Sequence, residues 1–259
     1  MQNNNLLPLI NENKTAFIPY LVAGHTNNEV FTAALELLDD LGADLIEIGI
    51  PFTDPIAEGK IIESAHHHAL KNNFKLDDLC KIVNKFRSNS DTPVIAMGYT
   101  NSFINPSPNQ VAKKLSENGF NGVLIVDLPA SETTIIRSFK DEGLEIIQLI
   151  APTTQLNLIE SFLDNDPALI YYITQRGITG SNNLNLTEIS QKLNSLKNLT
   201  NKPVVTGFGI KTEKDINDLK GLSDGIVIGS PIVEKINADP SLKELKKYVE
   251  PIVKAIKNE

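Results

Sequence analysis

The sequence predicts an α/β fold in which eight parallel strands close into a (β/α)8 barrel with an outer layer of helices. Short β-branched apolar runs recur roughly every thirty residues, and amphipathic stretches with helical spacing separate them. Eight such units exceed the roughly five to seven strands of an open doubly wound sheet. The length of 259 residues is typical of a TIM barrel, and the sequence shows no linker or low-complexity segment. We therefore expect one domain over residues 1–259.

Most predicted strands are apolar on both faces. This is the pattern of parallel strands covered by helices on one side and by the barrel interior on the other. In chain order the strands span residues 16–22, 44–50, 93–99, 122–128, 144–150, 169–174, 203–209 and 225–230.

The predicted helices place apolar residues on one face at intervals of three and four. They span residues 29–41, 109–117, 131–141, 157–164, 186–199, 212–219 and 241–257. Ser131 and Thr212 are predicted N-caps, because each hydroxyl precedes a glutamate at a helix start. Pro231, with Ser230 as its cap, predicts an extra short helix after the last strand.

Two segments are too long for simple connections. Residues 51–73 follow the second strand, and residues 174–186, rich in Gly, Asn, Ser and Thr, follow the sixth. Long loops within a compact domain are usually functional or disordered. In a TIM barrel the loops after the strands form the active-site face, so these segments are expected to contribute to a site.

Composition excludes several classes of function. The net charge of −8 and the pI near 5.1 argue against partners such as nucleic acids or anionic membranes. The single cysteine, Cys80, permits no disulfide within the chain, and the consecutive His66, His67 and His68 cannot converge on one metal ion from a helix. We expect these histidines to be solvated helix residues. Without a signal-peptide pattern or a membrane-length apolar run, a cytoplasmic location is predicted.

Two acidic residues are candidates for proton transfer. Glu47 lies within an apolar strand and points either into the barrel or towards the helices, where a charge requires a function or a partner such as lysine. Burial would raise its pKa towards neutrality, as acid–base catalysis requires. The loop after the same strand carries Asp54 and Glu58, either of which is a candidate second carboxylate in a different environment.

The last two strands carry a phosphate-binding pattern. Residues 207–209 read Gly-Phe-Gly, and Gly229 and Ser230 precede Pro231 at the start of the extra helix. TIM-barrel enzymes commonly bind phosphate with these two loops and the N-terminus of a small helix. Glycines required only for tight turns would explain either segment alone, whereas the combination favours a phosphate site.

Residues 46–59, IEIGIPFTDPIAEG, strongly resemble the signature of the tryptophan synthase alpha subunit family. Six further blocks follow the family order: FIPYLVAGHT, GYTN, GVLIVDLP, GITG, GFGI and GSPIV. The resemblance implies a lyase of tryptophan biosynthesis that cleaves indole-3-glycerol phosphate, without a cofactor, into indole and glyceraldehyde 3-phosphate.

The resemblance also implies roles for individual residues. Glu47 matches the principal acid–base residue, and Glu58 matches the carboxylate near the indole N–H, which is more often aspartate in the family. Thr179 matches a loop residue that closes over the substrate. Gly180, Gly209, Gly229 and Ser230 match phosphate-binding positions. Tyr20, Met97, Tyr99, Leu124, Tyr171 and Phe208 match the indole pocket.

The family works as an α2β2 heterotetramer with pyridoxal phosphate in the beta subunit, so the resemblance implies that partner and no pyridoxal phosphate or metal on this chain. Three alternatives remain open. The first is a non-catalytic barrel, which either binds a phosphometabolite or supports a partner. The second is a related phosphate-binding isomerase. The third is a lyase that releases indole without a partner.

Overall fold

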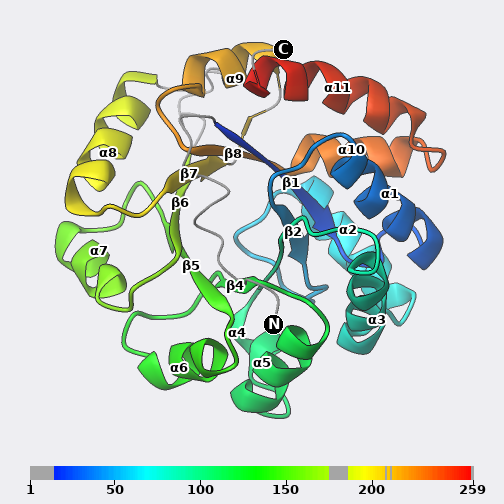
Figure 1. The fold of residues 1–259 in the computed structure, drawn as a ribbon, viewed down its shortest axis with the longest axis horizontal. Helices are drawn as coiled ribbons and strands as arrows, with labels where there is room; N and C mark the ends of the chain where they lie inside the picture. Colours follow the sequence, from blue (N-terminus) through cyan, green and yellow to red (C-terminus); the bar gives the residue numbers. More distant parts are fainter. Residues whose placement is uncertain (1–14, 175–185, 208, 211, 258–259) are drawn as a thin grey trace.

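A computed structural model describes residues 15–174, 186–207, 209–210 and 212–257. They form a closed barrel of eight parallel strands in sequential order, with helices around the outside (Figure 1). The predicted (β/α)8 fold is therefore confirmed, and the site that the barrel positions lies at the carboxyl ends of its strands.

The strands are short, and most are buried along their whole length. They are β1 (Ala16–Val22), β2 (Ile46–Gly49), β3 (Val94–Gly98), β4 (Gly122–Ile125), β5 (Glu145–Ile150), β6 (Leu169–Ile173), β7 (Val204–Gly207) and β8 (Gly225–Ile228).

The helices alternate with the strands, and several connections contain an additional helix. They are α1 (Asn28–Asp40), α2 (Lys60–Lys71), α3 (Leu76–Phe86), α4 (Thr100–Phe103), α5 (Pro108–Glu117), α6 (Thr133–Asp141), α7 (Leu156–Leu163), α8 (Leu186–Leu199), α9 (Glu213–Leu219), α10 (Ser230–Ala238) and α11 (Lys243–Lys257). Helix α10 confirms the short helix predicted after the last strand.

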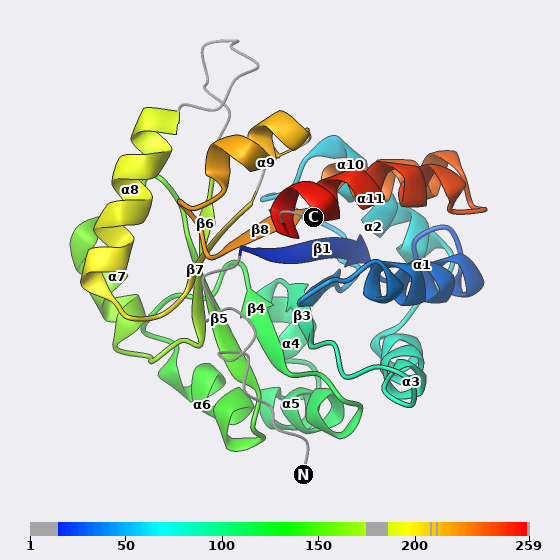
Figure 2. The same ribbon diagram turned by 45° about the horizontal axis from the view of Figure 1, so that its top comes forward.

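Strand alternation divides the apolar core into two layers. Ile46 and Ile48 of β2 point outward and pack in the layer between the strands and the helices, whereas Leu45 packs inside the barrel. Since successive strand residues face opposite sides, Glu47 and Gly49 share the inward face with Leu45. Helices α10 and α2 pack against β1, the strand next to β2, and α10 also contacts α11 (Figure 2).

The long segment over residues 51–73 is only partly a loop, because α2 occupies residues 60–71. Ile62, Ala65 and Ala69 form a buried stripe at helical spacing, which packs on β1 and stabilises this helix. Three consecutive polar histidines obscure the stripe in the sequence. The connection after β2 is therefore a short loop, residues 51–59, followed by α2 and α3.

The two predicted N-caps have different outcomes. Thr212 caps α9, because its hydroxyl accepts a hydrogen bond from the Asp215 backbone N–H at 3.2 Å and the Asp215 carboxylate accepts one from the Thr212 N–H at 3.0 Å. Ser131 is not a cap, because α6 begins two residues later and Glu132 occupies its N-cap position.

Among the helices in the described part of the chain, none is long and apolar enough to span a membrane.

Candidate active site

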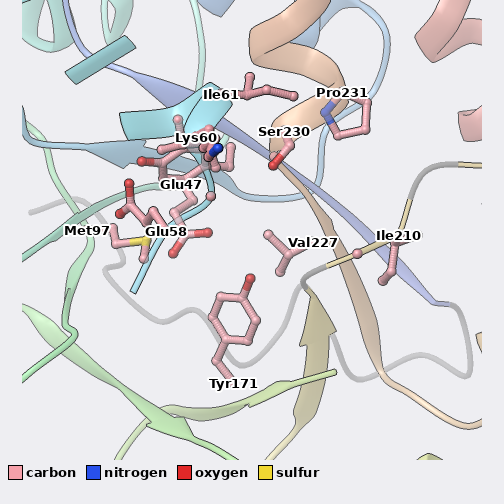
Figure 3. A pocket seen from close by; sticks show the side chains of 15 residues that line it. Glu47, Glu58, Lys60, Ile61, Met97, Tyr171, Ile210, Val227, Ser230 and Pro231 are labelled. Atoms are coloured by element: carbon pink, nitrogen blue, oxygen red, sulfur yellow. The ribbon is translucent and has the colours of Figure 1, made fainter. Parts of the chain in front are cut away.

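A pocket of about 280 Å³ opens at the carboxyl ends of the barrel strands. This volume lies near the lower end of the ~300–1,000 Å³ typical of small-molecule sites. Strand residues form its floor, and the starts of α2 and α10 form its rim (Figure 3). Glu47 and Glu58 line one side, and Ser230 lies at the rim. The pocket therefore combines acidic side chains with a helix N-terminus.

Glu47 points into the barrel, which resolves the two orientations that the sequence left open. Its side chain lines the pocket although the residue is only 1% exposed. Neither carboxylate oxygen has a hydrogen-bond partner within the described residues. Burial, with a smaller contribution from the negative charge of Glu58, raises the pKa of Glu47 to about 8. Glu47 is thus predominantly protonated at neutral pH and remains able to exchange its proton.

Two tyrosine side chains occupy the space beside strand glycines in the barrel, one next to Glu47 and one across the barrel from it. Tyr20 of β1 pairs in register with Glu47, and a Cβ added at Gly49 would overlap the Tyr20 hydroxyl. Across the barrel, a Cβ at Gly207 would overlap the Tyr171 hydroxyl. Glycine at these two strand positions therefore leaves room for the phenol rings, which form much of the pocket wall.

Glu58 also lines the pocket, and its side chain is only 2% exposed. Its Oε2 lies 2.7 Å from Nε2 of His66 in α2. His66 is 1% exposed, so the prediction that it is a solvated residue is wrong. His67 and His68 are exposed, as predicted. Helical spacing is the one feature of the sequence that indicates the burial of His66. It lies one position after Ala65 and three before Ala69, on the buried side of α2.

Contacts within the chain hold the loop that carries Glu58. The Ala57 backbone N–H donates to the Tyr99 hydroxyl at 3.1 Å, and the Phe52 ring stacks on the Tyr99 ring with centroids 4.9 Å apart. His67 Nε2 donates to the Thr53 carbonyl at 3.1 Å. Asp54, the other candidate acid of this loop, is exposed and lies outside the pocket lining. The structure therefore places Glu58, and not Asp54, beside Glu47.

The opposite side of the pocket contains the N-terminus of α10. Gly229 is the N-cap, Ser230 is the first helical residue and Pro231 follows it, so the prediction that Ser230 is the cap is wrong by one position. The backbone N–H groups at a helix N-terminus attract anions. Gly209, with φ of 77°, lines the same end. Lys60 is the one cationic residue among the described residues that line this pocket.

The structure brings together most of the predicted site residues that it describes. Tyr20, Met97 and Tyr171 line the pocket with both glutamates and with the phosphate candidates Gly209, Gly229 and Ser230. Leu124 packs in the inner core beside Met97, and Tyr99 lies behind the loop that carries Glu58, so neither lines the pocket. The predicted residues Thr179, Gly180 and Phe208 lie outside the described residues.

Comparison with known proteins identifies relatives over nearly the whole chain. The family model described as tryptophan synthase alpha chain matches residues 7–258. The chain is 35% identical to the tryptophan synthase alpha chain of Nitrosomonas europaea, over 90% of this chain and 86% of that protein. It is 34% identical to that of Thermoanaerobacter sp. strain X514, over 92% of each chain.

Solved structures show the same similarity. The crystal structure of tryptophan synthase subunit alpha from Legionella pneumophila superimposes with a TM-score of 0.88 at 30% identity, covering 98% of this chain and 97% of that one. The sequence match, which extends well beyond half of the chain, and the shared barrel together place this chain in the tryptophan synthase alpha chain family.

Proposed function

We propose that this chain cleaves indole-3-glycerol phosphate into indole and glyceraldehyde 3-phosphate, with Glu47 as the acid–base residue. The observation that carries the proposal is the Glu47 carboxyl group, which is buried at the pocket, unpartnered among the described residues and raised in pKa to about 8. Perturbed carboxyl groups of this kind cluster at functional sites. Family membership supports a carbon–carbon lyase.

In the proposed reaction the protonated Glu47 first donates its proton to indole C3. The ring then carries a positive charge shared with its nitrogen, and the Glu58 carboxylate stabilises that charge. Glu47, now ionised, accepts the proton of the adjacent glycerol hydroxyl as the bond between the side chain and C3 breaks. The bonding electrons restore the neutral indole, the hydroxyl carbon becomes an aldehyde, and Glu47 regains its proton.

The proposed substrate orientation follows from the two sides of the pocket. The indole ring packs among Tyr20, Met97 and Tyr171, next to the glutamates. The phosphate lies against Gly209, Gly229 and Ser230 at the start of α10, where main-chain N–H groups attract an anion. The roles of Tyr99, Leu124, Thr179, Gly180 and Phe208 that the resemblance implies remain predictions.

Activity should depend on pH in a direction that the pKa of Glu47 determines. Glu47 must be protonated when catalysis begins, and its pKa is about 8. We therefore expect kcat/KM for indole release to be flat below pH 8 and to fall about tenfold per pH unit above it, because kcat/KM reports the free enzyme. The measurement is indole formation from purified indole-3-glycerol phosphate between pH 6 and pH 10. Absence of indole formation at every pH would refute the proposed function.

Family membership implies a tryptophan synthase beta subunit as partner. We propose an α2β2 heterotetramer in the cytoplasm, with no cofactor on this chain and pyridoxal phosphate in the beta subunit. Adding the cognate beta subunit should then increase the kcat of indole-3-glycerol phosphate cleavage. Size-exclusion chromatography with light scattering should give the mass of two copies of each chain. An unchanged kcat and no complex would support a lyase that works alone.

A further inference from the structure

The hydrogen bonds of His66 select one tautomer of its ring, because the two ring nitrogens have different partners. Nδ1 accepts a hydrogen bond from the Phe52 backbone N–H at 3.2 Å, so Nδ1 carries no proton. The ring proton of a neutral imidazole is then on Nε2, which donates to Glu58 Oε2 at 2.7 Å. His66 therefore connects the first part of the 51–59 loop to the carboxylate near its end.

The surroundings of His66 restrict movement of its ring. The residue is 1% exposed and belongs to the buried stripe of α2, which packs against β1. The Tyr20 hydroxyl lies 3.3 Å from Nε2 on the barrel side. The donor that faces Glu58 is thus fixed relative to the barrel strands and to the pocket floor.

Glu58 depends on such an anchor more than a shorter acid would. Its carboxylate is connected to the loop backbone through several rotatable bonds, and its side chain is 2% exposed. The bond from His66 is the one hydrogen bond that the structure shows to this carboxylate within the described residues. A carboxylate that stabilises charge in a transition state must be held in place before the reaction, since later reorientation would weaken its effect.

We propose that His66 is a positioning residue, which holds the Glu58 carboxylate at the pocket so that it meets the ring nitrogen of the substrate. The proposal rests on the cleavage reaction proposed above. His66 itself makes no contact with the substrate and transfers no proton. It acts through Glu58, and its contact with Phe52 fixes which ring nitrogen donates.

Two substitutions separate the two bonds of His66. In His66→Asn the amide reaches only the former Nδ1 position, so the donor to Glu58 is lost. In His66→Gln the amide nitrogen reaches the former Nε2 position, so a donor to Glu58 remains. Hydrogen bonds to charged groups correspond to about 10- to 100-fold in rate. We therefore expect His66→Asn to lower kcat by that factor with little change in KM, and His66→Gln to recover most of the loss.

The matched control is His68→Asn, which alters an exposed histidine of the same helix and should leave kcat unchanged. A double-mutant cycle excludes a purely structural role. In a Glu58→Ala background, His66→Asn should lower kcat by less than about twofold, because the carboxylate that it positions is absent. An undiminished loss in that background, or an unchanged kcat for His66→Asn alone, would overturn the proposal.

A measurement on the unmodified protein does not depend on whether the variants fold. Nitrogen-15 NMR of labelled histidine should show one buried ring with unprotonated Nδ1 and protonated Nε2 at pH 7, and this signal should shift in Glu58→Ala. A ring protonated on Nδ1 would overturn the proposal even if the enzyme cleaves its substrate. If the ring has the expected form but no substrate is cleaved, the proposed function has failed and the hydrogen-bond geometry has not.

Discussion

Replacing Glu47 by glutamine is expected to lower kcat for indole release by about 10²- to 10⁴-fold, the range for loss of a general acid–base group. The amide has nearly the same shape as the carboxyl group but supplies no proton to indole C3 near neutral pH. The substitution leaves the proposed phosphate subsite at α10 untouched, so a non-cleavable indole alkyl phosphate should bind with a Kd within about twofold of the unmodified value. Stopped-flow or steady-state indole assays measure the first quantity, and calorimetry measures the second.

The same substitution tests the burial of Glu47 without any assay of activity. The pKa of Glu47 in the folded state, about 8, exceeds the ordinary glutamate value of 4.5, so folding favours the protonated form. The protonated Glu47 therefore contributes up to about 5 kcal/mol to the free energy of unfolding. This contribution is fully present below about pH 4.5 and is lost as the pH rises towards 8. Because glutamine does not ionise, Glu47→Gln should become more stable than the unmodified protein as pH rises from 5 to 9. A stability difference that is independent of pH would contradict the burial argument.

Replacing Glu58 by alanine is the second large effect, with an expected loss in kcat of about 100-fold. In the proposed reaction the Glu58 carboxylate stabilises a positive charge that exists on the indole ring only after C3 is protonated, so its removal should affect the transition state more than substrate binding. KM should therefore change little. Glu58→Gln, which keeps the shape and an acceptor for His66 but no charge, should lose nearly as much activity.

Asp54→Asn is the matched control for Glu58, since it removes a carboxylate from the same loop at an exposed position outside the pocket lining. Its kcat should lie within about twofold of the unmodified value, the range expected for a surface charge with weak long-range effects. An equal loss in Asp54→Asn and Glu58→Gln would show that the overall charge of the loop matters, and the specific role of Glu58 would be wrong.

The sequence predicts the barrel and the position of Glu47 because both follow from local patterns. Apolar runs of strand length at regular spacing predict a closed parallel barrel, and a charged residue within such a run must face a special environment. The period of two along β2 places Glu47 on the face of Leu45 and Gly49. The sequence does not show whether this face of β2 points into the barrel or towards the helices. The closed barrel in the structure shows that it points inward.

The network around Glu58 depends on contacts that the sequence pattern does not determine. His66 is eight residues from Glu58, and its role depends on how the 51–59 loop folds back over the start of α2. His66 opens a run of three histidines, and this polar run makes it resemble a solvated residue. Likewise, Tyr99 matches a pocket position by resemblance, yet its hydroxyl supports the loop through the Ala57 N–H. Tertiary packing therefore decides these contacts.

A crystal structure of this chain with a non-cleavable indole alkyl phosphate tests the central claim most directly. The proposed function predicts indole C3 within about 3.5 Å of the Glu47 carboxyl group, the ring N–H directed at Glu58, and the phosphate at the N-terminus of α10. An indole ring bound away from Glu47, or a phosphate bound away from Gly229 and Ser230, would contradict it.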